Sequence, residues 1–419
     1  MAPEVGILME TSLRISRGLL QGIIDYMRMN GPWKIRYTAG GMRDQLLPPD
    51  WDGDGVLARV NTPALARQLM RYRGPMVLFD LQEHYLPAFC TLSRVPRIVN
   101  DYAACGRLAA DYFLDRGYRH FAFFSPTLSS APGLEYDGTG LAEPNWSRER
   151  CEGFVGRLAE RGFPCAVYPT PQTARASHDF GREQKRIARW LASQSKPIAV
   201  FAAHDARGVQ VVEACNSSGL AVPSEVAVLG VNNDELLCET CAPSLSSIAL
   251  DSIRAGFMAA EMLDRLMRGE RSAPTVTRYQ PLCVETRGST FGFGSADPLV
   301  AQALARIEET NGFRIHPASL ADELNVSRRW LERRFKKTLG KGVAQLIRET
   351  MLNHVRRLVQ ETDIPFQKLA DDAGIATSAH LSVLFRRHFG TTMSAVRHSH
   401  AVPSHCATRS PERARLAST

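Results

Sequence analysis

The residues best suited to chemistry lie in a basic phrase that occurs twice near the end of the chain. Leu320–Gly340 and Leu369–Gly390 share the opening Leu-Ala-Asp, and each contains a Phe followed by two basic residues and closes on Gly. Each copy predicts a short helix, a tight turn and a second helix that carries more positive charge. Two helix-turn-helix units in tandem predict binding to the grooves of double-stranded DNA.

The second helix of the first copy has an apolar face and a charged face. Leu331 and Phe335 are four residues apart and predict the buried stripe, and Ser327 is a suitable N-cap. On the other face arginine can pair with guanine and glutamate can accept from cytosine N4, whereas Arg328 and Lys337 are expected at phosphates. The DNA-contacting residues predicted for this copy are Ser327, Arg328, Arg329, Glu332, Arg333, Lys336 and Lys337.

The second copy offers fewer hydrogen-bonding groups. Ala379 and Val383 take outward positions, where they can at best touch a thymine methyl group. The DNA-contacting residues predicted for this copy are Ser378, Ser382, Arg386 and Arg387. One helix over Val343–Gln360 is predicted to hold the two copies at a fixed distance. We therefore expect the first copy to read most of the bases and the second to anchor the DNA backbone.

Positive charge is concentrated in the same part of the chain. The net charge is +8, and the stretch from Ala296 to Thr419 alone has 19 Lys and Arg against 12 Asp and Glu. A nucleic-acid partner is therefore expected for the C-terminal part. No stretch is typical of a signal peptide or a membrane span, and nine scattered Cys favour a reducing cytoplasm over a disulfide framework. Cys238-x-x-Cys241 has no second pair at metal-site spacing, so neither a metal nor a cofactor is expected.

The first 290 residues alternate short apolar runs with amphipathic helical stretches. Val5–Met9 and Val226–Val231 predict buried strands, and Ile15–Met29 predicts a helix with an apolar residue at every fourth position. Regular alternation of this kind predicts an α/β fold with parallel sheets that are covered on both faces. Such folds bind their ligands at the carboxyl ends of the strands.

Polar side chains follow several of these predicted strands. They include Glu10, Ser12 and Arg14 after the first strand, Arg59 after the second, and His204, Asp205, Asn232 and Asp234 after two later strands. Carboxylates and amides can exchange hydrogen bonds with hydroxyl groups, and Trp146 could supply an apolar face for a sugar ring. The sequence therefore predicts a small sugar as the ligand of the large N-terminal part.

Residues 4–290 resemble the periplasmic-binding-protein-like effector domain of LacI-type repressors. The phrases that carry the resemblance are Asp101–Arg119, Arg150–Phe154, His204–Gly208, Val228–Glu235 and Pro243–Ile248. The duplicated phrase and its flanks resemble the DNA-binding domain of the AraC family. In this order the two parts resemble XylR-like carbohydrate regulators, a family whose sugar domain lacks the N-terminal DNA-binding headpiece of the repressors.

This resemblance implies two lobes that close on a sugar, with chain crossings near Asn100, Asn232 and Arg271. It also implies that Trp146, Arg150 and Asp205 contact the sugar. Asn232 stands where sugar binders usually have Asp, and Arg59 stands where an acidic residue is expected, so the sugar can differ from xylose. The effector-binding residues expected from position and resemblance together are Ser12, Arg14, Arg59, Trp146, Arg150, Asp205 and Asn232.

The expected organisation is an effector domain over residues 1–288, a linker over 289–298, an AraC-type domain over 299–397 and a disordered tail over 398–419. The expected function is a cytoplasmic, dimeric regulator, an activator of carbohydrate genes that acts on RNA polymerase and is not an enzyme. The alternative is a sugar-binding or sugar-processing protein whose basic domain serves another partner. An ordinary LacI-type repressor is disfavoured, because its headpiece would have to precede residue 4.

Overall fold

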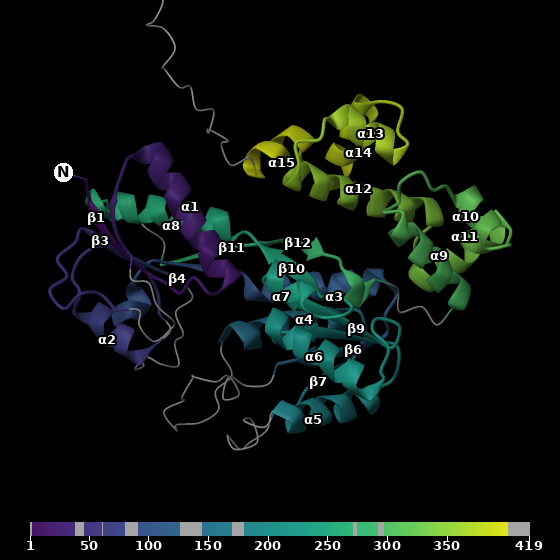
Figure 1. Cartoon of the computed structure of the whole chain (residues 1–419), viewed down its shortest axis with the longest axis horizontal. Helices are drawn as coiled ribbons and strands as arrows, with labels where there is room; N and C mark the ends of the chain where they lie inside the picture. Colours follow the sequence, from purple (N-terminus) through teal and green to yellow (C-terminus); the bar gives the residue numbers. More distant parts are fainter. Residues whose placement is uncertain are drawn as a thin grey trace, which may run out of the picture. The chain divides into compact units, whose positions relative to one another are not determined.

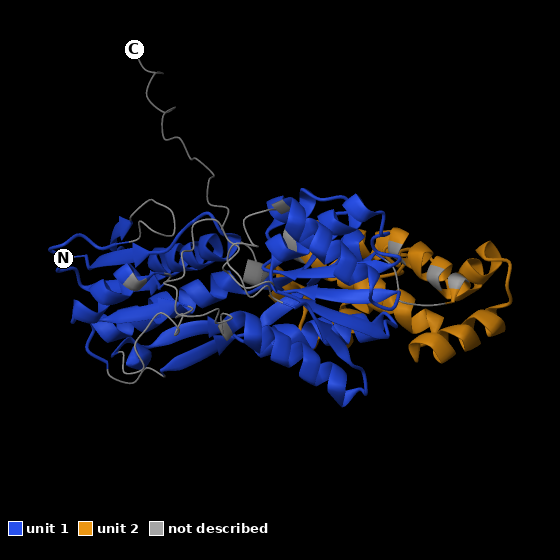
Figure 2. Cartoon of the chain, turned by 90° about the horizontal axis from the view of Figure 1, so that it is seen from below, with its two compact units in different colours: residues 1–296 blue, residues 297–419 orange. Residues whose placement is uncertain are grey.

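The computed structural model describes residues 2–37, 46–60, 62–79, 91–125, 145–169, 180–270, 275–291 and 297–400. The chain divides into two compact units, Met1–Ala296 and Asp297–Thr419 (Figure 2). The first unit has an α/β architecture with two sheets, and the second is entirely helical (Figure 1). Both features confirm the predicted fold class.

The first lobe of unit 1 is built on a 6-stranded sheet in the order β11-β5-β4-β3-β1-β2. Its strands are β1 (Glu4–Leu8), β2 (Lys34–Tyr37), β3 (Gly55–Arg59), β4 (Met76–Phe79), β5 (Arg97–Asn100) and β11 (Val276–Tyr279). All neighbouring strands are parallel. The helices of this lobe are α1 (Arg14–Asn30), α2 (Pro63–Arg71) and α8 (Ser252–Met267), with a short 3₁₀ turn, η2 (Thr91–Arg94).

The second lobe is built on a 6-stranded sheet in the order β12-β10-β9-β8-β6-β7. Its strands are β6 (His120–Phe124), β7 (Cys165–Val167), β8 (Ile198–Ala202), β9 (Val226–Val231), β10 (Ser246–Leu250) and β12 (Pro281–Glu285). Only the β10–β12 pair is antiparallel among the described pairings. The helices are α3 (Tyr102–Asp115), α4 (Asn145–Glu160), α5 (Phe180–Ala192), α6 (Asp205–Ser218) and α7 (Glu235–Glu239), followed by the 3₁₀ turn η5 (Gly288–Thr290).

The continuous apolar runs became the central strands. Every residue of β8 and β9 is buried, because these strands have sheet neighbours on both sides and helices over both faces. By contrast β2 lies at the edge of its sheet, with three of its four residues exposed. Its sequence, Lys-Ile-Arg-Tyr, does not form an apolar run, and we did not predict this strand.

Two of the three predicted crossings between lobes were misplaced. The chain leaves the first sheet after Asn100, as predicted. It returns only after Leu250, because β10 continues the second sheet beyond Asn232. The last crossing lies between Tyr279 in β11 and Pro281 in β12, and not near Arg271. The prediction failed there because β10, β11 and β12 were not recognised from the sequence.

Unit 2 contains two helix-turn-helix units in tandem. The described helices are α9 (Pro298–Glu309), α10 (Pro317–Glu323), α11 (Arg328–Leu339), α12 (Val343–Glu361), α13 (Phe366–Ala373), α14 (Ser378–Phe389) and α15 (Met393–His400). α10 and α11 form the first helix-turn-helix, α13 and α14 form the second helix-turn-helix, and α12 joins them (Figure 1). Leu331 and Phe335 of α11, and Leu381 and Phe385 of α14, are completely buried, which is the repeated pattern that the duplicated phrase predicted.

Two predicted boundaries shift in the structure. Ser289 and Thr290, predicted as linker, are instead buried in the second lobe. Of the other predicted linker residues, Phe291 and Asp297 are described, Pro298 already begins α9, and residues 292–296 lie outside the described part. α15 extends to His400, so the helix continues past the predicted domain end at residue 397. Residues 401–419 lie outside the described part, and among the helices within it none is both long and apolar enough to cross a membrane.

Candidate effector site and DNA-binding surface

Close packing of α3 on α4 places Arg150. A Cβ atom on Gly106 would lie 2.2 Å from the Arg150 carbonyl oxygen, so only glycine lets these two helices approach so closely. The Arg150 guanidinium is buried, and it donates from Nη1 to the Ala203 carbonyl oxygen at 2.5 Å. It also lies 5.3 Å from the Trp146 ring and 5.4 Å from the Tyr102 ring. Aromatic faces therefore hold this cation beside the end of β8.

Asp205 lies at the start of α6 and is 2% exposed. Its carboxylate accepts hydrogen bonds from Ser247 Oγ at 2.5 Å and from the Asp234 backbone N–H at 2.8 Å. Burial raises the pKa of Asp205 to about 7, although the hydrogen bonds from Ser247 and Asp234 and the charge of Arg150 oppose the shift. A carboxyl group that titrates near neutral pH can accept from a ligand hydroxyl as a carboxylate or donate to it as an acid.

Two neighbours of Asp205 are also affected by burial. The pKa of His204 is lowered to about 3 by burial first and then by the positive charges of Arg207 and Arg150, so the imidazole is neutral at pH 7. His204 meets Trp146 edge to face, with ring centroids 5.7 Å apart. Burial also lowers the pKa of Arg207 to about 10. The region is therefore polar and largely dry, which strengthens each hydrogen bond that a ligand makes there.

Arg59 at the end of β3 forms a buried ion pair in the first lobe. Its Nη1 atom lies 2.5 Å from Glu10 Oε1, and Glu10 is completely buried after the end of β1. Ser16 Oγ lies 3.5 Å from the same Nη1 atom. We predicted Arg59 as a ligand contact but not its pairing with Glu10, which the first strand's end places opposite because β1 and β3 are neighbours. The pair fixes the direction of the guanidinium.

The start of α1 joins the two lobes. Arg14 pairs with Glu235 at 3.3 Å, and Arg17 lies 3.9 Å from Asp234. Arg17 also donates from Nη1 to the carbonyl oxygens of Thr11 and Ser12, at 2.9 Å each. Since the Asp234 N–H donates to Asp205, the first lobe is linked through these pairs to the centre of the site. The part of Ser12 that takes part is its carbonyl oxygen, which accepts from Arg17. Arg14 takes part through its salt bridge with Glu235, and both of these side chains are exposed.

Asn232 lies directly after β9 in an unusual backbone conformation. Its φ is +107° and that of Asn233 is +48°, values that non-glycine residues seldom adopt and that often mark functional loops. The Asn232 N–H donates to the Ile248 carbonyl oxygen at 3.0 Å. The Asn233 N–H donates to Ser247 Oγ at 3.0 Å, which ties the loop to the serine that holds Asp205.

Five of the seven predicted effector residues lie at or just after the carboxyl ends of β1, β3, β8 and β9. Trp146 and Arg150 of α4 reach the end of β8 through His204 and Ala203, whereas Arg59 pairs with Glu10 after β1. Glu10, His204 and Asp234, which we had noted after strands without selecting them as ligand contacts, belong to the same group of residues, and Arg17, Tyr102 and Ser247, which we had not noted, complete it. Position after a strand marks Glu10, His204 and Asp234 in the sequence. Tyr102 and Ser247 lie in two of the phrases that carry the resemblance, Asp101–Arg119 and Pro243–Ile248, but no spacing assigns them to the site, because only the packing of α3 and the pairing of β10 bring them here.

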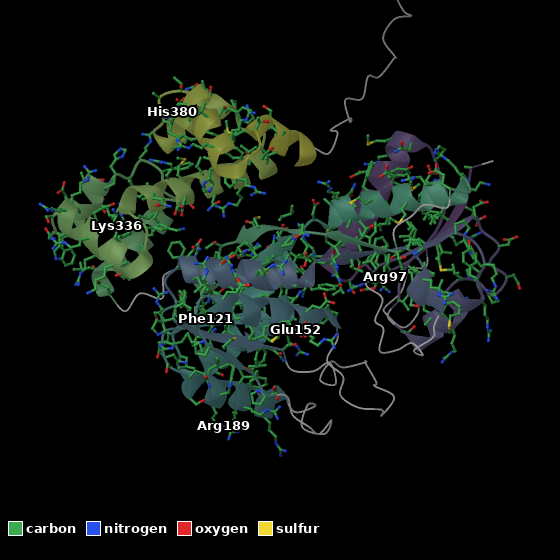
Figure 3. All side chains as sticks on the ribbon, turned by 180° about the vertical axis from the view of Figure 1, so that it is seen from behind. Arg97, Phe121, Glu152, Arg189, Lys336 and His380 are labelled. Atoms are coloured by element: carbon green, nitrogen blue, oxygen red, sulfur yellow. The ribbon has the colours of Figure 1, made fainter. Side chains whose placement is uncertain are left out.

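The DNA-binding surface begins with α11. Ser327 caps this helix, because its hydroxyl oxygen accepts from the Trp330 N–H at 3.2 Å. The predicted contacts Ser327, Arg328, Arg329, Arg333, Lys336 and Lys337 are exposed. Figure 3 shows Lys336 on this helix. Trp330 packs within its own helix under the guanidinium of Arg334, 4.4 Å from the ring, and Arg334 pairs with Asp297 at 3.0 Å.

Glu332 has a structural role that we did not predict. Its Oε2 atom accepts from the Val343 N–H at 3.1 Å, at the first turn of α12. The N-cap position of α12 is Gly342, which has no side chain to cap the helix. The carboxylate of Glu332 therefore caps α12 through Oε2, and its contact with a cytosine amino group stays a prediction. The sequence offered a signal for this role, since Gly342 cannot satisfy the first N–H groups of the helix that follows it.

The exposed face of α14 is less polar, as predicted, but its composition differs in detail. Ser382 Oγ donates to the Ser378 carbonyl oxygen at 2.8 Å, so this hydroxyl already has an intrahelical partner. The cap is Thr377, whose hydroxyl accepts from the His380 N–H at 3.2 Å. Arg386 and Arg387 are exposed, as are His380, labelled in Figure 3, and Val383. We had not selected His380. It lies three residues after the N-cap of α14, as Trp330 does in α11.

Contacts beyond α12 fix the spacing of the two helix-turn-helix units. Arg314, in the loop after α9, donates from Nη2 to the Asp371 carbonyl oxygen of α13 at 2.9 Å. Phe313 packs edge to face on His354 of α12, with ring centroids 4.9 Å apart. At the other end Arg397 of α15 donates to the Ile364 carbonyl oxygen at 2.5 Å. The two recognition helices are therefore held as one body rather than by a single linking helix.

Cys238 and Cys241 are free thiols in the structure, and Cys241 Sγ lies 3.6 Å from the Cys238 carbonyl oxygen. Among the described residues no group of three or more His, Cys, Asp and Glu side chains is arranged to hold a metal ion.

Comparisons with known proteins agree with both halves of the chain. Residues 110–290 match the family of periplasmic binding protein-like domains, and residues 320–399 match a helix-turn-helix domain family. The chain is 28% identical to the xylose operon regulatory protein of Haemophilus influenzae over 81% of its own length and 83% of that protein. It is 25% identical to the xylose operon regulatory protein of Escherichia coli over 93% and 95% of the two chains.

A solved structure shares the whole fold. The structure of the xylose-binding transcription activator xylR superposes with a TM-score of 0.59 at 24% identity, covering 96% of this chain and 99% of that one. A LacI family regulator from Mycobacterium smegmatis covers 68% of the chain with a TM-score of 0.51. The chain is thus similar over most of its length to xylose operon regulatory proteins, and it shares with them the order of a periplasmic-binding-protein-like domain followed by a helix-turn-helix domain.

Proposed function

We propose that this protein senses a small, xylose-like sugar and in response regulates the transcription of carbohydrate-utilisation genes, acting as a cytoplasmic activator. The observation that carries the sugar assignment is the grouping of Trp146, Arg150 and Asp205. An aromatic ring, a guanidinium and a carboxyl group lie together in a buried region at the ends of strands. Aromatic faces suit the apolar face of a pyranose ring, and the two polar groups suit its hydroxyls. The xylose operon regulatory proteins provide the analogy for the ligand.

The DNA-binding half supports regulation rather than sugar processing. Two exposed basic helices, α11 and α14, are held at fixed spacing, which suits recognition of two successive major-groove segments. We propose that the protein binds its promoter as a homodimer and recruits RNA polymerase. Its relatives regulate transcription, and we propose no enzymatic activity for it.

A screen of sugars tests the effector assignment. Xylose, ribose, arabinose and glucose are compared by thermal shift and by calorimetry, and each mixture is examined afterwards for chemical change. A sugar that raises the unfolding temperature, binds reversibly and is recovered intact supports the proposal. Turnover of the sugar would favour the enzyme alternative, and no binding of any of the four would remove the support for a sugar effector.

A further inference from the structure

The segment that leads out of the effector domain is tied to the candidate effector site. Thr286–Thr290 is the last stretch of well-packed chain in the second lobe, and Asp297 begins unit 2. Ser289 and Thr290 are completely buried although they follow the last strand. This segment precedes the DNA-binding unit in the chain, so the contacts that hold it are candidates for control of the response.

Arg287 makes many of these contacts. Its guanidinium group reaches three different segments of the second lobe. Its Nη2 atom donates to Asn233 Oδ1 at 2.8 Å, its Nη1 atom to the Leu245 carbonyl oxygen at 3.1 Å, and its Nε atom to Glu239 Oε1 at 2.9 Å. The side chain is only 15% exposed. All three nitrogens of the planar guanidinium are thus used at once, an arrangement that the single ammonium of lysine cannot reproduce.

From Asn233 the contacts lead directly to the candidate effector carboxyl group. The Asn233 N–H donates to Ser247 Oγ at 3.0 Å, and Ser247 Oγ donates to Asp205 Oδ1 at 2.5 Å. The next residue in the loop, Asp234, donates its N–H to Asp205 Oδ2 at 2.8 Å. Asp205 and Arg287 are therefore joined through one loop, residues 232–234, by hydrogen bonds at every step.

The backbone of Arg287 and the residues that follow it in Thr286–Thr290 form a second set of hydrogen bonds, with Ser246. The Arg287 N–H donates to Ser246 Oγ at 2.7 Å, and Thr290 Oγ1 donates to the same hydroxyl at 2.6 Å. Ser289 Oγ accepts from the Ser246 N–H at 2.8 Å and donates to the Val228 carbonyl oxygen at 2.6 Å. Ser246 and Ser247 are neighbours in β10, so the two hydrogen-bonded groups share one strand.

The loop between them adopts an unusual backbone conformation. Asn232 and Asn233 both have positive φ, and Asn232 at +107° lies outside the region that asparagine ordinarily adopts. Such a conformation persists only where surrounding contacts impose it. A ligand that changes the contacts of Asp205 or Asn232 changes what imposes it, and so shifts the balance between two loop conformations.

We propose that Arg287 couples effector binding to DNA binding, by transmitting the conformation of the 232–234 loop to the segment that leads into the DNA-binding unit. The proposal rests on the proposed function, since it takes the effector to bind at Asp205 and Asn232. It assigns Arg287 a positioning role and no contact with either the sugar or DNA.

The test measures coupling separately from binding. The probe is whichever of xylose, ribose, arabinose and glucose stabilises the wild-type protein most, and the DNA is the promoter fragment adjoining the gene. The coupling factor is the ratio of the DNA dissociation constants without and with that sugar, and in allosteric proteins generally such factors are about 5 to 150. Arg287→Lys keeps the charge but not the three hydrogen bonds. Its coupling factor should fall below about 2, while each separate affinity stays within about threefold of wild type.

A second variant and a cycle guard against simple misfolding. Asn233→Gly removes the amide partner of Arg287 and tolerates the positive φ. The double variant should couple no worse than either single variant, because both substitutions interrupt the same path. Arg265→Lys is the matched control, since Arg265 also pairs with a glutamate, Glu270 at 2.7 Å, but at an exposed position. It should couple like wild type.

The outcomes separate the two hypotheses. A wild-type protein whose DNA binding responds to none of the four sugars overturns the proposed function, and the coupling role with it. A wild-type protein that responds, together with Arg287→Lys that responds equally, overturns only the role of Arg287. Additive effects in the double variant, or equal loss of sugar binding and coupling, would likewise show that no shared path exists.

Discussion

Replacing Asp205 by Asn separates the charge of this side chain from its shape. In the folded protein the carboxyl group accepts from Ser247 Oγ and from the Asp234 N–H. Asparagine can keep both contacts, because its oxygen accepts from the N–H while its amino group donates to a hydroxyl that is also able to accept. The variant should therefore fold, and its stability below pH 4, where the wild-type carboxyl group is protonated, should differ from wild type by less than about 1.5 kcal/mol.

The pH dependence of stability should change in a defined direction. Burial raises the pKa of Asp205 from its ordinary value of 3.8 to about 7. The unfolded chain therefore loses this proton near pH 4, whereas the folded protein keeps it until about pH 7. The stability that the group contributes is fully present below pH 4 and is lost as the pH rises towards 7, by at most about 1.4 kcal/mol per pH unit. Asp205→Asn lacks this loss, so its unfolding temperature should rise relative to wild type between pH 5 and pH 8.

Asp205→Asn should weaken sugar binding although it raises the unfolding temperature. Hydrogen bonds to a charged group contribute about 1.5–3 kcal/mol and those between neutral groups about 0.5–1.5 kcal/mol. If the sugar hydroxyls bind the carboxylate, the difference of roughly 1–2 kcal/mol weakens binding by Asp205→Asn about 5- to 30-fold at pH 8. Asp205→Ala also removes the acceptor of the Asp234 N–H, and it should abolish the sugar response while DNA affinity without sugar stays unchanged.

Isothermal titration calorimetry at pH 6 and pH 8 measures the dissociation constant of the sugar. Differential scanning calorimetry over the same pH range measures the unfolding temperature. Asp251→Asn is a suitable control, because Asp251 caps α8 through the Arg254 N–H and asparagine caps helices equally well. An unchanged dissociation constant for the sugar at pH 8 would refute the role of Asp205 in binding. Parallel pH profiles of stability for wild type and Asp205→Asn would refute the buried, proton-retaining carboxyl group.

Three further predictions concern the DNA-binding unit. Arg333→Ala should cost about 1–3 kcal/mol of discrimination at one base pair, measured by anisotropy on operators with single substitutions, and a uniform loss on all sequences would move Arg333 to the phosphate-contacting class. Lys337→Ala should weaken all sequences alike and lower the slope of log affinity against log salt by about one, whereas an unchanged slope would exclude a phosphate contact. Glu332→Ala should lower the stability of unit 2 by about 0.5–2 kcal/mol through the lost cap on Val343, and an altered base preference in the folded variant would contradict the capping role.

The sequence was most informative where local spacing carries the structure. Leu331 and Phe335 sit four residues apart and are buried, and the same pair recurs as Leu381 and Phe385, so the duplicated helices could be placed to within a residue or two. The buried strands were equally clear, because β8 and β9 are continuous apolar runs. These elements depend on periodicity alone.

Features that depend on pairing between distant segments could not be predicted. Arg59 looked like a free ligand contact, but the neighbouring strand brings buried Glu10 to it. Glu332 was predicted to contact a base, but its carboxylate also accepts a hydrogen bond from the first turn of the helix that follows. Ser247 lies in the phrase Pro243–Ile248, but nothing in that phrase indicates its partner, and only the place of β10 beside β9 brings its hydroxyl to Asp205. In each case the decisive partner is set by tertiary structure and not by spacing along the chain.

The central claim is that one protein binds a specific promoter and a sugar, and that each affects the other. The most direct measurement is the affinity for the adjoining promoter fragment and for a scrambled fragment of equal length, at increasing salt, with and without the best-binding sugar. We expect tighter binding to the promoter, a steep fall with salt and a reproducible shift on adding the sugar. Equal affinity for both fragments, or a promoter affinity that no sugar alters, would contradict the account.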